Sequence, residues 1–235
     1  MHRPRRTYDL DVIDFVRTSR SEAETALIGA ALGRLLRAGD VVLLDGMLGA
    51  GKTTLVRAVA TSMELDIGAV ASPTFVVIHE YARPGGGSPD HPELIHVDAY
   101  RLQDASDLDS LGWDTVVARL RTNAALVIEW AERLGSSAIA SSEPARLRIE
   151  HVDETSRELN FTVPDSWRSR AGFADLVKRQ PTICPVTGTR VEPDSPTYPF
   201  ANERARMADL YRWFSGSYTV SRDAMQADFD EPGRD

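Results

Sequence analysis

The chain has 235 residues, of which 42% are hydrophobic and 26% charged, and this composition suits one medium globular domain with or without a small appendage. No apolar run approaches the ~20 residues that a membrane span needs, and no apolar stretch follows the basic start MHRPRRTYDL, so we expect neither a membrane segment nor a secretory signal. The formal net charge of −8 argues against tight, autonomous binding to nucleic acid, and the one cysteine, Cys184, excludes an intramolecular disulfide and indicates a cytoplasmic protein.

The first part of the chain predicts an arm and then a helix. Residues 1–20 are charged with two short apolar patches, which favours a loosely attached arm, although YDLDVIDFV could pair as a strand. Residues 21–38 carry apolar side chains at helical spacing, and Ser21 followed three residues later by Glu24 is a capping-box signature. Gly39 is expected to end this helix. Its apolar face would hold Leu27, Ala31, Leu32, Leu35 and Leu36.

Alternating strands and helices follow. VVLLD (41–45) is typical of a strand buried on both faces, and TLVRAVATSM indicates a helix that leaves the glycine loop after it. TFVVIHEYA and ELIHVDAY predict strands on either side of a mobile turn, RPGGGSPDHP, and ALVIEW predicts another buried strand. DASDLDSLGWDTVVARLR predicts a helix interrupted near Gly112, and RLRIEHVD and RELNFTV predict a closing hairpin around ETS.

This order predicts an α/β fold, a P-loop NTPase-like sheet of mixed strands with flanking helices, plus a small C-terminal appendage. We place the P-loop domain at residues 21–168, a linker at 169–180 and a separate module at 181–222. The tail, residues 223–235, is acidic with few core-forming residues and is expected to be disordered.

The stretch GMLGAGKTT (46–54) satisfies the phosphate-loop pattern, with Gly46, Gly51, Lys52 and Thr53 at the required spacing. Glycines let successive backbone N–H groups turn toward phosphate oxygens, and the helix N-terminus adds a positive dipole end. Lys52 could reach the β- and γ-phosphates, and the Thr53 hydroxyl could ligate Mg²⁺. The alternative, a chance glycine-rich turn, is disfavoured because a strand and a helix flank the loop as the motif requires.

Two carboxylates are candidates for the Mg²⁺ site, because Asp98 and Glu129 each end an apolar strand and should emerge at the carboxyl edge of the sheet. Either could instead only cap the turn that follows its strand. The run Ser72-Pro73-Thr74 could form a rigid phosphate-sensing turn or a plain hydroxyl-stabilised turn.

Three further candidates have less specific signals. His96 shares a strand face with Asp98 and is either a core residue or a catalytic one. Tyr100-Arg101 and Trp130 could stack on a partner or pack on the surface.

Four ordered motifs, GMLGAGKTT, SPTFVVIHEY, HVDAYRL with LDSLGWD, and VIEWAERL, resemble the TsaE family of P-loop ATPases. The similarity runs from about Ser21 to Val163. It implies that the chain hydrolyses ATP and acts with a threonylcarbamoyl transferase subunit and its pseudo-subunit. The modified base would be the adenosine beside the anticodon in ANN-decoding tRNAs, so tRNA would be contacted through the complex.

The resemblance also assigns site residues. The implied nucleotide-binding residues are Gly46, Leu48, Gly49, Ala50, Gly51, Lys52, Thr53, Thr54, Glu22, Ser72 and Trp130, with Thr25 beside Glu22 near the adenine. The implied Mg²⁺ ligands are Thr53 and Glu129, and the implied catalytic residues are Lys52, Thr74 and Asp98. Met47 departs from the Asp usual in the family, and we expect little loss of nucleotide binding but a possible change in the contact with the transferase.

The C-terminal segment CPVTGTRVEPDSPTYPFANERARMADLYRWFSGSYTV is similar to the small YacG-type zinc-ribbon family of gyrase inhibitors. Of its four metal positions only Cys184 is retained; the others are Thr187, Ala201 and Ala205, so we predict no structural zinc and doubt gyrase inhibition. The segment should then either pack on the ATPase domain or be only partly ordered. The predicted docking residues are Pro199, Phe200, Leu210, Trp213 and Phe214.

Two alternatives stay open. A P-loop kinase could use His96 or Asp98 as the base that takes the proton from an acceptor hydroxyl. A nucleotide-gated binding module with negligible turnover would suit the turn at residues 83–92 and the appended C-terminal segment.

Overall fold

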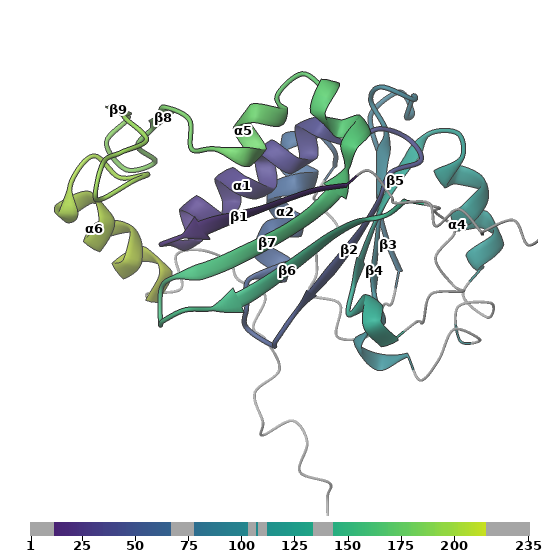
Figure 1. Cartoon of the computed structure of the whole chain (residues 1–235), viewed down its shortest axis with the longest axis horizontal. Coiled ribbons are helices and arrows are strands. Elements are labelled where there is room, and N and C mark those ends of the chain that lie inside the picture. Colours follow the sequence, from purple (N-terminus) through teal and green to yellow (C-terminus); the bar gives the residue numbers. More distant parts are fainter. Residues whose placement is uncertain (1–11, 67–77, 103–106, 108–111, 134–142, 215–235) are drawn as a thin grey trace, which may run out of the picture.

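The computed structural model describes residues 12–66, 78–102, 107, 112–133 and 143–214, and in this part seven strands form one sheet (Figure 1). The sheet order is β1-β7-β6-β2-β5-β4-β3. Strands β6, β2, β5 and β4 are parallel neighbours. At one edge β7 pairs antiparallel with β6 and β1 antiparallel with β7, and at the other edge β3 pairs antiparallel with β4. The strands are β1 (Val12–Ser19), β2 (Val41–Gly46), β3 (Ile78–Tyr81), β4 (Glu93–Asp98), β5 (Ala124–Glu129), β6 (Ala145–His151) and β7 (Arg157–Pro164). The predicted α/β class with a mixed sheet is confirmed, and so is the closing hairpin, β6–β7.

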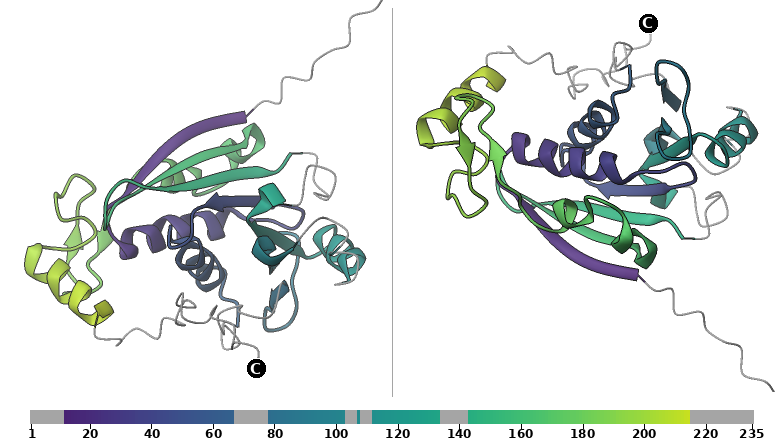
Figure 2. Two further views of the ribbon diagram at one scale, coloured as in Figure 1. Left: turned by 90° about the horizontal axis from the view of Figure 1, so that it is seen from below. Right: turned by 90° about the horizontal axis from the view of Figure 1, so that it is seen from above.

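Helices cover both faces of this sheet. Helices α1 (Glu22–Leu35) and α2 (Lys52–Ser62) pack on one face, and α4 (Trp113–Leu120) packs on the other (Figure 2). Along β2 the even-numbered Val42 and Leu44 face α1 and α2, while the odd-numbered Val41 and Leu43 join the cluster of α4. The strand is therefore apolar at every position because both of its faces are covered. None of the described helices has the length and apolar character needed to cross a membrane.

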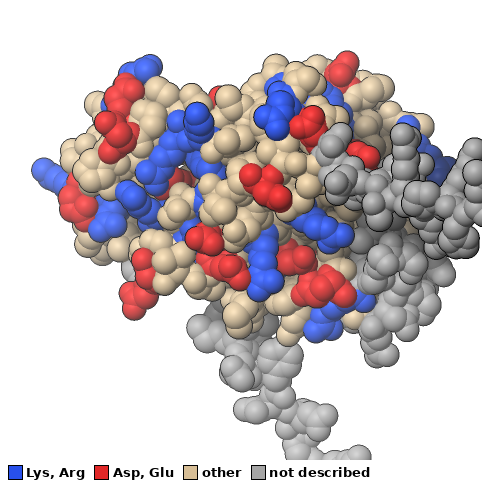
Figure 3. Space-filling model, in the orientation of Figure 1, with Lys and Arg blue, Asp and Glu red and all other residues tan. Residues whose placement is uncertain are grey.

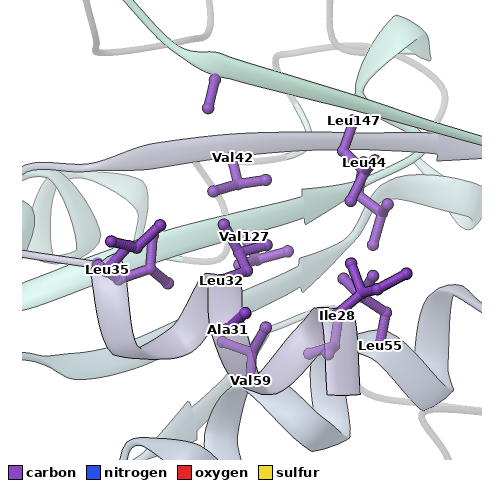
Figure 4. Packing of buried hydrophobic residues seen from close by; sticks show 14 of the residues in the cluster. Ile28, Ala31, Leu32, Leu35, Val42, Leu44, Leu55, Val59, Val127 and Leu147 are labelled. Carbon is purple, nitrogen blue, oxygen red and sulfur yellow. The ribbon is translucent and has the colours of Figure 1, made fainter. Parts of the chain in front are cut away.

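The larger core lies between the sheet and the pair α1–α2. Figure 4 shows residues of β2 and β5 meeting side chains of both helices. The two helices approach closely because α1 has glycines in the contact. A Cβ on Gly29 would lie 2.6 Å from the carbonyl oxygen of Leu55, and one on Gly33 would lie 2.6 Å from that of Val59. Larger residues at these two positions would push α1 away from α2.

The predicted start of α1 is confirmed, but the helix ends earlier than predicted. The Ser21 side chain accepts a hydrogen bond from the backbone N–H of Glu24 at 3.1 Å. The last helical residue is Leu35, three residues before the predicted end. Beyond it, the backbone N–H of Arg37 donates to the carboxylate of Asp40 at 2.7 Å, and this local turn replaces the next helical hydrogen bonds.

Two segments correct the predicted division of the chain. Residues 12–19, predicted as part of a loose arm, form β1, which pairs along its length with β7. Phe15 of this strand stacks on Phe161 at 4.7 Å, so the strand alternative was the better one. Residues 169–180, predicted as a linker, contain α5 (Phe173–Val177), whose Leu176 is fully buried in the main core. Residues 1–11 and the predicted disordered tail lie outside the described residues.

The C-terminal module has a small core of its own, built on β8 (Thr182–Ile183), β9 (Arg190–Val191) and α6 (Glu203–Phe214). This core packs against Ala23 and Leu27 of α1, which explains why Leu27 faces away from the main core. Of the predicted docking residues, Pro199 and Phe200 are buried and Leu210 is half-buried, while the side chains of Trp213 and Phe214 lie outside what the structure describes. The buried residues of the module core are Cys184, Val191, Tyr198, Phe200 and Ala205.

A buried ion pair joins α1 to the segment that leads into the module. Both oxygens of Glu24, which is fully buried, accept hydrogen bonds from Arg179, at 2.6 and 2.9 Å. The Arg179 guanidinium also lies over the ring of Tyr198, whose hydroxyl donates to the carbonyl oxygen of Gln180. The pair places an opposite charge directly against the buried carboxylate, and Arg17 adds a second positive charge nearby.

We expect Arg179→Ala to destabilise the chain by about 3 kcal/mol, because it leaves the Glu24 carboxylate buried without its partner. The measurement is the free energy of unfolding from denaturant titration. The matched control is Arg190→Ala, which breaks the exposed pair with Glu192 and should cost at most about 1 kcal/mol. Equal losses in the two variants would contradict the role given to Arg179.

Candidate nucleotide-binding site

The phosphate loop connects β2 to α2 at the carboxyl edge of the sheet. Gly46 has φ 151°, and a Cβ there would lie 2.6 Å from the carbonyl oxygen of Ile149 on the neighbouring strand. Gly51 is the N-cap of α2 with φ 103°, and no side chain caps the helix. The first N–H groups of α2 are therefore left for a ligand, as an anion site requires.

Lys52 is the buried cation of this loop. It is 6% exposed, and its ammonium donates to the carbonyl oxygens of Gly46 at 2.8 Å and Met47 at 3.1 Å. Burial lowers the pKa of Lys52, and the carboxylates of Glu129 and Asp98 act in the opposite direction. The ammonium thus already lies inside the loop that would surround a phosphate.

Asp98 and Glu129 are the last residues of two adjacent parallel strands, β4 and β5, and lie opposite each other in the sheet. Glu129 is 4% exposed, and one of its oxygens lies 3.0 Å from Nε2 of His96. Asp98 accepts the backbone N–H of Tyr100 at the start of the short 3₁₀ turn η1 (Ala99–Arg101), and burial raises the pKa of this carboxyl. Both carboxylates are thus at the edge where β2 gives way to the phosphate loop, as predicted.

Trp130 lies directly against Lys52. Its ring centroid is 3.9 Å from the ammonium, and its backbone has φ 58°, an uncommon conformation for a bulky residue. Tyr100 packs against the same ring with centroids 5.1 Å apart, and the Arg133 guanidinium lies over Tyr100. The aromatic pair therefore forms one wall of the site.

The start of α1 borders the other side of the loop. The Thr54 hydroxyl donates to the carboxylate of Glu22 at 3.2 Å, and the side chain of Thr25 lies beside Gly51. Glu22 and Thr25, one helical turn apart, thus reach the first turn of α2 from a single face of α1.

Other predicted residues occupy the loop itself. Met47 and Leu48 are exposed at its tip, Ala50 is buried, and Thr53 is exposed in the first turn of α2. The predicted residues Ser72 and Thr74 lie outside the described residues.

Asp45 and Glu132 form a carboxyl pair that sequence reasoning missed. Asp45 precedes the loop on β2, and Glu132 lies in the 3₁₀ turn η2 (Ala131–Arg133). Burial, together with the hydrogen bond to Glu132, raises the pKa of Asp45 to about 6, and that hydrogen bond lowers the pKa of Glu132. Asp45 therefore takes up a proton at a higher pH than an ordinary carboxyl group does, whereas Glu132 stays ionised to a lower pH. The sequence did contain a signal for this pair. Asp45 directly precedes Gly46 of the phosphate loop, and Glu132 follows Glu129 by three residues within another recognised motif.

The donor set suits Mg²⁺ bound together with a nucleotide. In the described part of the chain, no three His, Cys, Asp or Glu side chains are placed to hold a metal ion by themselves. Mg²⁺ commonly takes one or two protein oxygens and completes its shell with phosphates and water. The Glu129 carboxylate and the Thr53 hydroxyl are oxygen ligands of this kind, so the residues fit the ion.

Comparisons with known proteins agree on the family. A family model described as "Threonylcarbamoyl adenosine biosynthesis protein TsaE" matches residues 19–159. A protein of Mycobacterium bovis named "tRNA threonylcarbamoyladenosine biosynthesis protein TsaE" is 41% identical over 139 residues, covering 55% of this chain and 77% of that protein. A relative of the same name from Streptomyces coelicolor is 38% identical over 151 residues, covering 63% of this chain and 95% of its own.

A solved structure supports the fold. The crystal structure of YdiB from Bacillus subtilis superposes with a TM-score of 0.51 at 24% identity, over 70% of this chain and 95% of that one. The family match ends before the C-terminal module, so the similarity of that module to zinc ribbons stays a prediction.

We expect Asp45→Asn to remove a pH-dependent loss of stability. Folding raises the pKa of Asp45, so its stabilising contribution is complete below about pH 4 and is lost as the pH rises through about 6. The free energy of unfolding of the variant relative to wild type should therefore improve by about 1 kcal/mol from pH 4 to pH 7. This value is reduced because Asp45 is only half-buried and Glu132 is exposed to solvent.

Asp90→Asn is the control, because Asp90 is exposed and should show no such trend. The measurement is denaturant unfolding of all three proteins across this pH range. An Asp45→Asn effect that is the same at every pH would contradict the raised pKa of Asp45.

Proposed function

The chain belongs to the TsaE family, and on that premise we propose that it is the ATP-binding and ATP-hydrolysing subunit of a tRNA-modifying complex. Family membership gives it a role in the biosynthesis of threonylcarbamoyladenosine in tRNA. The proposed partners are a threonylcarbamoyl transferase subunit and its pseudo-subunit, and the proposed target is the adenosine next to the anticodon in ANN-decoding tRNAs.

One observation carries the nucleotide part of this proposal: Lys52, Asp98 and Glu129 meet at the end of the phosphate loop. A buried ammonium, two strand-end carboxylates and an uncapped helix start are the parts that phosphoryl transfer needs. They come from three separate elements, β4, β5 and α2, so their meeting is a property of the fold and not of one motif.

The proposed binding step is a movement of Lys52. Its ammonium would exchange the carbonyl oxygens of Gly46 and Met47 for phosphate oxygens, while the N–H groups of residues 49–54 surround the phosphates. The Trp130 ring would exclude water from one side of the Lys52 ammonium, and the exclusion of water strengthens the attraction between the ammonium and phosphate. Glu22 and Thr25 would lie toward the base from the start of α1.

The proposed hydrolytic step uses the carboxylates. Mg²⁺, held by Thr53 and Glu129, would supply positive charge to the β- and γ-phosphate oxygens. Asp98, whose pKa burial raises, is suited to accept a proton from the attacking water. Ser72 and Thr74 are proposed to contact the γ-phosphate.

The surface supports contact with tRNA through partners. Figure 3 shows acidic and basic side chains interspersed over one face, and the net charge is −8, so no sequence-independent attraction to phosphate backbones follows. The exposed Met47 and Leu48 at the loop tip are proposed to contact the transferase.

We expect Lys52→Ala to weaken ATP binding about 10- to 100-fold, because it removes a charged hydrogen-bond donor to the phosphates. Isothermal titration calorimetry with Mg²⁺ and a non-hydrolysable ATP analogue measures the affinity. Lys178→Ala, which removes an exposed lysine after α5, is the control and should bind as wild type does. Unchanged affinity in Lys52→Ala would overturn the phosphate-loop assignment.

Hydrolysis is tested with ATP labelled on its γ-phosphate. We expect release of free phosphate, stimulated by the transferase pair, and loss of release in Asp98→Asn and Glu129→Gln. Label transferred to an added acceptor would instead identify a kinase. No release from wild type, with partner affinity changed by the same two variants, would identify a nucleotide-gated binding module.

We also propose that the C-terminal module needs no zinc. Its core of Cys184, Val191, Tyr198, Phe200 and Ala205 is apolar and packs on α1, which supplies burial that small metal-dependent modules lack. One zinc per chain by metal analysis, lost in Cys184→Ser, would overturn this proposal.

A further inference from the structure

The contact between His96 and Glu129 is a buried polar contact of the site. His96 is 3% exposed and Glu129 is 4% exposed, and Nε2 of His96 lies 3.0 Å from Oε1 of Glu129. Among the described residues, His96 is the hydrogen-bond partner of the Glu129 side chain. A buried carboxylate with so few partners depends strongly on each of them.

The sheet register brings the two side chains together. On β4 and β5 Asp98 is opposite Glu129, and His96 is opposite Val127. Because side chains alternate along a strand, these four residues project from the same face of the sheet, the face that α1 and α2 cover. His96 lies two residues before Asp98 on β4. Its side chain therefore approaches Glu129 from the interior of the sheet and not from the carboxyl end of the strands.

The direction of the hydrogen bond follows from the partners. An ionised carboxylate only accepts, so Nε2 of His96 donates. The other ring nitrogen, Nδ1, is buried and has no hydrogen-bond partner among the described residues. The ring stacks beside Tyr81 with centroids 6.4 Å apart, which holds its plane. The contacts thus favour one tautomer and one orientation, with the proton on Nε2.

We propose that His96 is a positioning residue for Glu129: its Nε2–H holds one carboxylate oxygen, so that the other is presented at the end of β5. This inference rests on the proposed function, in which Glu129 ligates Mg²⁺. His96 itself touches neither metal nor nucleotide. Without the bond, the Glu129 side chain would lose its fixed rotamer, and the ion would lose an oriented ligand.

The role predicts a specific pattern in two variants. His96→Leu removes the donor at similar volume, and we expect binding of Mn²⁺ with a non-hydrolysable ATP analogue to weaken about 10- to 100-fold. His96→Gln keeps an N–H donor near the position of Nε2, and binding should stay within about threefold of wild type. Affinity for the analogue without metal should change in neither variant.

The test measures free Mn²⁺ by electron paramagnetic resonance during titration of the full chain with the analogue. The matched control is Val127→Ala, the buried residue opposite His96 on β5. It should lower the free energy of unfolding by about 1 kcal/mol or more without weakening metal binding. This separates a loss of packing from a loss of the hydrogen bond.

The outcomes decide between the claims. Wild-type metal affinity in His96→Leu would overturn the positioning role and leave the nucleotide function intact. Equal losses in His96→Leu and His96→Gln would show that the ring and not its N–H matters, which also overturns it. Absence of metal-dependent analogue binding in wild type would overturn the proposed function and this inference together.

Discussion

The buried ammonium of Lys52 is the interaction on which the site depends. It lies among the carboxylates of Glu129, Asp98, Glu132 and Asp45, which all oppose the effect of burial on its pKa. One positive charge therefore lies among four acidic groups. In the proposed function, such a site would repel a bare triphosphate and would be complementary to one that brings Mg²⁺ with it. On this proposal, the excess of carboxylates would favour a metal–nucleotide complex over the free nucleotide.

The sheet order explains how these groups meet. Strand β2 lies between β6 and β5, so the phosphate loop emerges beside the ends of β5 and β4 that carry Glu129 and Asp98. The glycine contacts of α1 hold α2, and with it Lys52, against this edge. Helix α1 also connects the site to the C-terminal module, because Glu22 reaches Thr54 from its first turn while Glu24 binds Arg179. The module is thus packed on the helix that borders the phosphate loop.

The sequence predicted the features that depend on local patterns. The capping box of Ser21, the phosphate loop and the apolar strands that end in Asp98 and Glu129 each need only a few neighbouring residues, and the structure has them at those places. The pairing of β1 with β7 was harder because its partner is more than a hundred residues away. The contacts of His96 and Asp45 were also missed, since register and burial determine them, and a lone His or Asp carries no such signal. The assigned roles of Ser72 and Thr74 remain predictions.

Hydrogen–deuterium exchange with and without Mg²⁺ and a non-hydrolysable ATP analogue tests most directly whether this sheet edge is the nucleotide site. A site centred on Lys52 predicts slower exchange at residues 46–54, at the ends of β4 and β5 and in the first turn of α1, with the strands β1 and β7 unchanged. Protection confined to other segments, or none at a saturating concentration of the analogue, would contradict it.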